Sequence, residues 1–118
     1  MKAAPWNDQE NRALVALYFV MLDAATSGQS YNKAAMIREQ QQDAENAYTL
    51  DDCPLMYRSR GSIEAKLMNA SAAHCDLRPE SETMATHGYK AWGNYQAALK
   101  ASMLTSIERR EQQARMSA

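Results

Sequence analysis

The chain has 118 residues, a formal net charge of −1, and 46% hydrophobic and 23% charged residues. This length is enough for one domain with a buried core, and the composition argues against wholesale disorder. The near-neutral charge disfavours a protein that holds nucleic acid through an overall basic surface. Ala, Gln, Glu, Met and Leu are abundant and lose little side-chain freedom in a helix, so the composition favours an all-α fold.

A first helix is predicted over residues 8–26. Asn7 followed by Glu10 fits a capping box, in which each side chain accepts a hydrogen bond from the other residue's backbone N–H. Gly28 follows the helix and favours its termination, because glycine adopts the left-handed conformation easily. We expect Leu17 to be buried, since it belongs to a face of apolar residues spaced three and four apart. The members of this face are Leu14, Leu17, Tyr18, Met21 and Leu22.

A second helix is predicted over residues 31–46, with a weaker apolar face than the first. Its apolar positions are Tyr31, Ala34, Ala35 and Ile37. Residues 47–57 lose this periodicity and contain Asp51, Asp52 and Pro54, which is typical of an exposed loop.

A third helix is predicted from residues 60–62 to about residue 75, with two neighbouring stripes along it. The apolar stripe consists of Ile63, Leu67, Ala70 and His74. The second stripe lies about 100° around the helix and consists of Ser62, Lys66, Asn69 and Ala73. This pattern is typical of a helix that packs with one face and contacts a partner with the next. We therefore expect Lys66 and Asn69 to lie off the packed face.

Residues 76–93 have the composition of a loop, and a fourth helix is predicted over residues 94–115. Its apolar seam consists of Tyr95, Ala98, Leu99, Ser102, Met103, Ser106 and Ile107. The seam could dock on the first helix of the same chain. Met103, Leu104 and Ile107 leave open an antiparallel pairing of this helix in a homodimer. The predicted fold is a single all-α domain over residues 1–118: a three-helix core within 6–96 and a long C-terminal helix.

The sequence lacks a recognisable catalytic apparatus. Cys53, His74, Cys75 and His87 do not have the short spacing of a metal site, so we expect no metal. Cys75 follows His74 directly, but neighbours on a helix point about 100° apart, and His74 fits a packed core position. No glycine-rich phosphate loop is present. We expect a chain that is not an enzyme and has no cofactor.

Two cysteines, Cys53 and Cys75, do not make a disulfide framework. No signal peptide opens the sequence, and no apolar run approaches the roughly 20 residues that span a bilayer. These features predict a cytoplasmic protein with free thiols and no membrane partner.

Four blocks of the sequence, in this order over residues 6–96, are the most distinctive feature. They are Trp6 with Glu10; Tyr31-Asn32-Lys33; the stretch from Arg58 to Ala72, RSRGSIEAKLMNASA; and Gly88-Tyr89-Lys90 with Asn94-Tyr95-Gln96. Together they resemble the segment found ahead of HNH-type nuclease domains in bacterial restriction-like proteins. Two details depart from that family: the linker between Lys33 and Arg58 is longer and more acidic, and Ala91 replaces the usual proline. Because the sequence ends before a nuclease domain, the resemblance implies the recognition part of such a protein without its cutting part.

The resemblance implies a Myb/SANT-like helix-turn-helix whose third helix enters the major groove of DNA. The candidate DNA-binding residues are Arg58, Arg60, Ser62, Lys66 and Asn69. The cations would neutralise phosphates, with Arg58 also able to reach a guanine, and Asn69 would pair with an adenine edge.

Structural roles for the same residues stay open. Arg58 could pair with Glu64, Ser59 or Ser62 could cap the third helix, and Asn69 could bond to a neighbouring carbonyl.

A second hypothesis is a protein-binding inhibitor of a host defence nuclease, of the anti-restriction or anti-CRISPR type, encoded by a phage or mobile element. The acidic segment from Asp43 to Asp52 would be its candidate patch, acting on the partner's surface or in place of DNA. The weak overall charge favours this hypothesis, and the stretch from Arg58 to Asn69 favours DNA binding.

Overall fold

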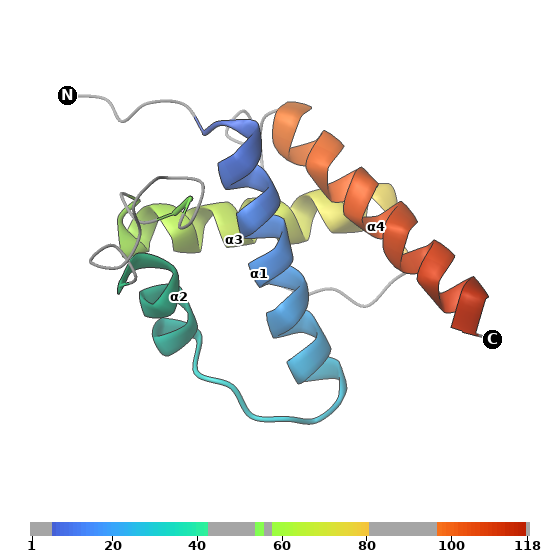
Figure 1. Ribbon diagram of the computed structural model, residues 1–118, viewed down its shortest axis with the longest axis horizontal. Coiled ribbons are helices and arrows are strands. Elements are labelled where there is room, and N and C mark those ends of the chain that lie inside the picture. The colour runs from blue at the N-terminus through green and yellow to red at the C-terminus, as the bar shows by residue number, and fades with distance from the viewer. Residues whose placement is uncertain (1–5, 43–53, 56–57, 81–96, 118) are drawn as a thin grey trace.

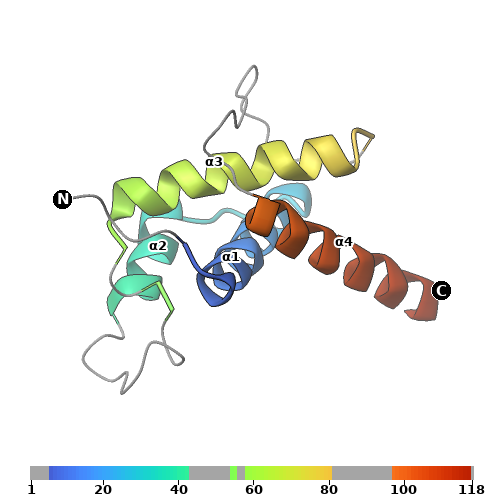
Figure 2. The same ribbon diagram turned by 90° about the horizontal axis from the view of Figure 1, so that it is seen from above.

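The computed structural model describes residues 6–42, 54–55, 58–80 and 97–117. These residues form four helices and no strand: α1 (Asp8–Thr26), α2 (Lys33–Gln42), α3 (Arg60–Leu77) and α4 (Ala97–Ser117). Figure 1 shows α1 between α2 and α4, and Figure 2 shows α3 running along one side of these three helices. The predicted all-α fold, with three helices followed by a long fourth one, is confirmed.

The first helix has the predicted bounds and the predicted cap. Asn7 Oδ1 accepts a hydrogen bond from the backbone N–H of Glu10 at 2.8 Å, and the Glu10 carboxylate accepts one from the backbone of Asn7 at 3.0 Å. Gly28 follows the helix with φ of +77°, in the left-handed region that favours glycine. A local sequence pattern was sufficient to predict this helix and its cap, because the residues that cap the helix are close together in the chain.

The second helix is described over a shorter range than predicted. Asn32 caps it, because its side chain accepts a hydrogen bond from the backbone N–H of Ala35 at 3.0 Å, so the helix begins at Lys33 rather than at residue 31. The predicted end of this helix, residues 43–46, and most of the predicted loop 47–57 lie outside the described residues.

The third and fourth helices, in contrast, extend past their predicted C-terminal ends. Ser59 caps α3 by accepting a hydrogen bond from the backbone N–H of Ser62 at 3.1 Å, so the capping role left open in the sequence falls to Ser59. Both helices end two residues later than predicted, at Leu77 and Ser117. Residues 81–96, which include the predicted start of α4, lie outside the described part of the chain.

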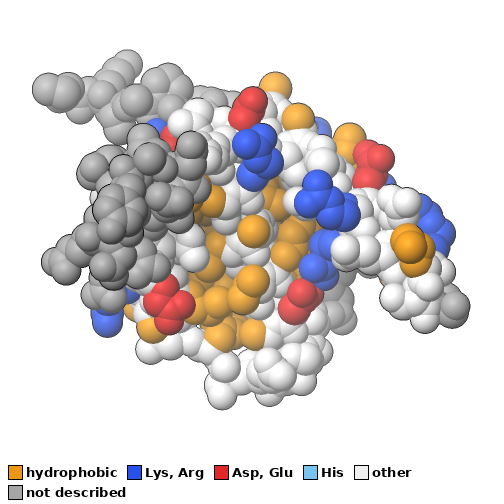
Figure 3. Space-filling view, viewed as in Figure 1, with side chains coloured by type: hydrophobic (Ala, Val, Ile, Leu, Met, Phe, Trp, Pro, Cys, Tyr) orange, Lys and Arg blue, Asp and Glu red, His pale blue; other side chains and the backbone are white. Residues whose placement is uncertain are grey.

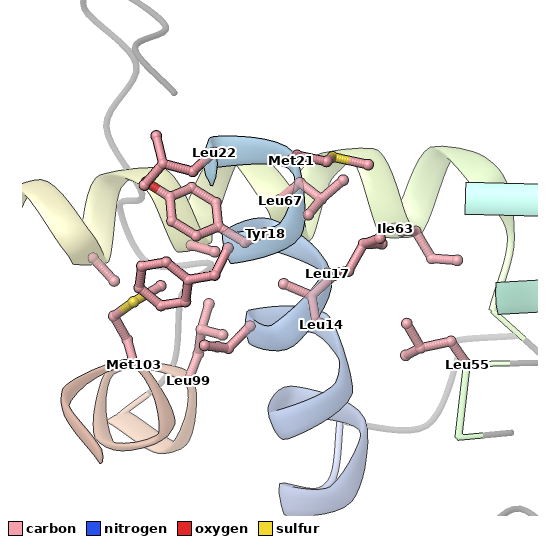
Figure 4. Close-up of a cluster of buried hydrophobic side chains, with 14 of the residues drawn as sticks. Leu14, Leu17, Tyr18, Met21, Leu22, Leu55, Ile63, Leu67, Leu99 and Met103 are labelled. Carbon is pink, nitrogen blue, oxygen red and sulfur yellow. The ribbon is translucent and has the colours of Figure 1, made fainter. Parts of the chain in front are cut away.

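One hydrophobic cluster joins all four helices and the short described segment at Leu55. Figure 4 shows that neighbouring residues of α1 pack on different sides of the helix. Leu17 lies on the side of Ile63 and Leu55, and Tyr18 lies on the side of Leu99 and Met103. Leu17 is 5% exposed, which confirms its predicted burial. The cluster consists of Trp6, Leu14, Val15, Leu17, Tyr18, Phe19, Met21, Leu22, Ile37, Leu55, Ile63, Leu67, Ala70, Ala73, Leu99, Met103 and Ile107.

Helix α4 packs against α1 and α3 of its own chain. Leu99, Met103 and Ile107 of its seam are buried there, which fits the intramolecular docking among the two arrangements considered. Ion pairs reinforce both contacts: Arg110 binds Asp23 of α1, and Glu111 binds Arg78, the residue that follows α3. Among the described helices, none is both long enough and apolar enough to cross a bilayer.

Candidate functional site

The predicted partner-facing stripe of α3 is largely buried. Lys66 is 8% exposed and Asn69 is 3% exposed, so the expectation that they lie off the packed face is wrong. The reason is that α3 contacts α1, α2 and α4, which bury more than one stripe of it. The exposed residues of α3 beyond its first position are Gly61, Ala65, Cys75 and Asp76.

Lys66 belongs to a compact group at the start of α1 and α3, which we call the Trp6 cluster: Trp6, Glu10, Arg58 and Lys66. The Arg58 guanidinium binds the Glu10 carboxylate through Nε and through Nη2, the latter at 2.9 Å. The Arg58 Cζ atom lies 5.0 Å from the centroid of the Trp6 ring, and the Lys66 Nζ atom lies 5.5 Å from it. Two cations thus share one aromatic ring, and one of them also has a carboxylate partner.

The titration of the cluster follows from this geometry. Burial raises the pKa of Glu10, but hydrogen bonds from Arg58 and from the Asn7 backbone, with the charges of Arg58 and Lys66, outweigh it and leave the pKa below 4.5. Burial lowers the pKa of Lys66, the charge of Arg58 lowers it further, and Glu10 partly offsets both. The carboxylate is therefore the partner that makes two close cations tolerable in a buried site.

The Trp6 cluster joins two of the four distinctive sequence blocks. Trp6 and Glu10 come from the first block, and Arg58 and Lys66 come from the third. Gln41 adds a link from α2, because its side chain donates a hydrogen bond to the Arg58 carbonyl at 2.8 Å. These residues therefore hold three helices together, whatever else they do.

The five candidate DNA-binding residues are not brought together on one open surface. Arg58 pairs with Glu10 instead of Glu64, and Glu64 pairs with Arg60 at 2.9 Å. The Arg60 side chain is 61% exposed, and Ser62 is half-buried next to the cap of α3. Of the five, only Arg60 is exposed to a partner in this structure.

A different surface carries unpaired cations: the α1–α4 groove, an open hollow of about 350 Å³ between these helices. Arg12 and Arg109 line it, and both are exposed. Within the described residues, neither guanidinium has an ion pair or hydrogen bond. The remaining lining residues are Asp8, Ala16, Ala98, Ala101, Ser102, Thr105 and Ser106.

Sequence reasoning missed the α1–α4 groove. Arg12 and Arg109 each look like a solvated charge on the outer face of a helix, which is the commonest role of such a residue. No spacing rule predicts that two helices from opposite ends of the chain place them on one hollow.

On the other side of α1 lies a second hollow, the α1–α2 groove, of about 290 Å³. Leu17, Val20 and Met36 give it an apolar character, and Val20 is 54% exposed. Figure 3 shows the hydrophobic side chains that gather on this face of the molecule. An exposed valine beside an open apolar groove is a feature of contact surfaces for other proteins.

His74 has the packed position that the sequence predicted. It is 5% exposed, its Nδ1 atom lies 2.8 Å from the Tyr18 hydroxyl, and its ring lies edge-on to Phe19 with centroids 5.3 Å apart. Cys75 is an exposed free thiol, whereas Cys53 and His87 lie outside the described residues. The described residues contain no group of three potential metal ligands.

We predict that acidification weakens the fold through His74. Burial and the charges of Arg110 and Arg78 lower the pKa of His74 below its usual value, so the unfolded chain takes up this proton first. The free energy of unfolding should therefore fall as the pH drops below about 6.5. Urea unfolding at about pH 7.5 and 5.5 measures this, because the lowered pKa of Glu10 acts only at more acidic pH. His74→Gln should flatten the dependence, and an equal slope in this variant would contradict the assignment.

Comparison of the chain with protein families, curated proteins and solved structures gives no match. The likeness to segments ahead of HNH-type nucleases therefore stays a prediction that rests on the four sequence blocks. Function has to be argued from the surfaces of this chain.

Proposed function

We propose that the chain is a non-enzymatic DNA-binding module that contacts backbone phosphates through the α1–α4 groove. The observation that carries the proposal is the pair of exposed, unpaired guanidiniums of Arg12 and Arg109 on one hollow. Guanidinium groups bind phosphate oxygens with two parallel hydrogen bonds, which makes arginine the usual residue for this contact.

The rest of the groove suits the same ligand. Ser102 and Ser106 also line the groove and offer hydroxyl donors, and the Thr105 hydroxyl donates to the Ala101 carbonyl at 3.1 Å. Small side chains, such as that of Ala16, leave room for a backbone to approach. Figure 3 shows Lys and Arg side chains along the boundary between α1 and α4, with acidic side chains at its two ends, and Asp8 is the one acidic residue among those that line the groove.

This proposal differs from the groove-entering third helix that the resemblance implies. Lys66 and Asn69 are buried, so they support the fold and offer no base contact on the described surface. Contacts from Arg12 and Arg109 would reach phosphates alone, and phosphate contacts position a protein without reading sequence. We therefore propose binding with little dependence on DNA sequence.

The test is a salt titration of affinity for duplex DNA, followed by fluorescence anisotropy. The affinity should fall as salt rises, since each phosphate contact contributes about 0.9 to the slope of log affinity against log salt. The double variant Arg12→Ala/Arg109→Ala should weaken binding to all sequences alike and lower that slope by about two.

Arg38→Ala is the matched control, because Arg38 is an exposed arginine on α2, away from the α1–α4 groove. This variant should bind DNA as the parent chain does. No affinity for DNA at low salt, or an equal loss in the double variant and in Arg38→Ala, would contradict the proposal.

The protein-binding hypothesis has its own supporting observation, the α1–α2 groove with its exposed Val20. The acidic segment from Asp43 to Asp52, proposed earlier for this role, lies outside the described residues. Inhibition of DNA cleavage by an HNH-type restriction nuclease tests the hypothesis. Val20→Asp should abolish inhibition by placing a charge in the apolar contact, and Arg12→Ala should not.

A further inference from the structure

A third cavity, of about 250 Å³, lies where the C-terminal parts of α1 and α3 meet α4. Phe19, Leu22 and Ile107 give it an apolar floor, and His74, Arg78 and Arg110 supply nitrogen donors around it. Arg12 and Arg109 do not line this cavity, so it is separate from the surface proposed for DNA.

His74 lines the cavity, and one of its two ring nitrogens is left to bond a ligand. Its Nδ1 atom is bonded to the Tyr18 hydroxyl, and within the described residues Nε2 has no hydrogen-bond partner. When Tyr18 donates to Nδ1, the neutral ring carries its hydrogen on Nε2 and becomes a donor. Burial of the ring fixes the direction of this donor, because His74 is also packed against Phe19.

The two guanidiniums of the cavity are held in place and still have donors to spare. Arg110 binds both oxygens of Asp23, at 2.6 and 3.1 Å, and its Cζ atom lies 4.2 Å from the Phe19 centroid. Arg78 binds Glu111 through Nε and Nη2 and the Leu77 carbonyl through Nη1. A guanidinium has five N–H groups, so both side chains keep free donors after these bonds are made.

The charges around the cavity favour a single negative charge beside His74. The nearby charges that lower the pKa of His74 are both guanidiniums, Arg110 and Arg78, so the imidazole lies in a positive field. Asp23 and Glu111 balance these two cations at the rim, which disfavours a ligand with several negative charges.

We propose that this cavity binds a small organic monocarboxylate with an aromatic or branched apolar body. The carboxylate accepts hydrogen bonds from His74 Nε2 and from the free N–H groups of Arg78 and Arg110. The apolar body lies against Phe19, Leu22 and Ile107, where it leaves water. The volume of about 250 Å³ is sufficient for one ring and its carboxylate.

The experiment is a titration of the ¹⁵N-labelled chain followed by amide NMR spectra, with benzoate, acetate and benzyl alcohol as probes. Benzoate should cause saturable shifts at residues 19–26, 74–78 and 107–111. It should bind about tenfold more tightly than acetate, which lacks the ring, and than benzyl alcohol, which lacks the charge.

Variants separate the site from non-specific binding. Arg110→Gln and Arg78→Gln should each weaken benzoate binding by about fivefold or more, since each removes a charged donor. Arg38→Gln, on an exposed face of α2, should leave it unchanged. The proposal is overturned if acetate or benzyl alcohol binds as tightly as benzoate, if the shifts do not saturate, or if both cavity variants, still folded by their spectra, bind benzoate as the parent does.

Discussion

Leu17→Ala is expected to lower the free energy of unfolding by about 2–5 kcal/mol, because it leaves a cavity in the hydrophobic cluster. Leu17 is 5% exposed and lies between α1 and the side chains of Ile63 and Leu55 (Figure 4). Few side chains nearby can move to fill the space, since Ile63 and Leu55 are themselves fully buried on other segments. Urea unfolding followed by helical circular dichroism measures the change.

Val20→Ala, one turn further along α1, is the matched control. Val20 is 54% exposed, so the same kind of truncation should change stability by less than about 1 kcal/mol. A loss below about 0.5 kcal/mol for Leu17→Ala, or equal losses in both variants, would mean that the face of α1 has been assigned wrongly.

The parts of the fold that were predicted correctly depend on residues close together in the chain. The cap of α1 needs only Asn7 and Glu10, and its buried face repeats every three or four residues up to Leu22. The seam of α4 follows the same rule, and Leu99, Met103 and Ile107 are all buried. Such signals are local, so a single sequence contains them in full.

The candidate site depends on residues that are far apart in the chain, and the sequence alone was insufficient to predict which of its side chains are buried. Lys66 and Asn69 were expected to lie off the packed face because their stripe is about 100° around the helix from its apolar stripe. Two residues that interact with Lys66, Trp6 and Glu10, lie near the start of the sequence, 60 and 56 residues earlier in the chain. The burial of Asn11 cannot be traced to a polar partner: it is fully buried on α1, and its carboxamide has no hydrogen-bond partner among the described residues.

The Trp6 cluster leads to the second large expected effect. Glu10→Ala should lower the free energy of unfolding by about 3–4 kcal/mol, because Arg58 and Lys66 would stay close together in a buried site without their carboxylate. The Arg58 and Glu10 side chains are each 10% exposed, so water offers little compensation. The same change removes half of the capping box of α1, which adds to the loss.

Glu64→Ala is the matched control, since it removes a carboxylate from an arginine that is 61% exposed. This exposed pair should contribute less than about 0.5 kcal/mol. Acid unfolding adds a second measurement. The lowered pKa of Glu10 contributes stability that is present above about pH 4.5 and is lost as the pH falls through the pKa of the folded state. Glu10→Ala should lose this part of the acid dependence, and Glu64→Ala should keep it.

The double variant Glu10→Ala/Arg58→Ala tests whether the two residues act as a pair. It should cost about 1–3 kcal/mol less than the sum of the single changes, because each single change leaves a charge without its partner and the double change leaves neither. The Arg58→Ala change also removes the contact between the guanidinium and the Trp6 ring. Because the double variant lacks this contact too, its stability should stay below that of the parent chain. Additive losses, within about 0.5 kcal/mol, would show that Glu10 stabilises α1 through its cap alone and that Arg58 is held by packing on Trp6.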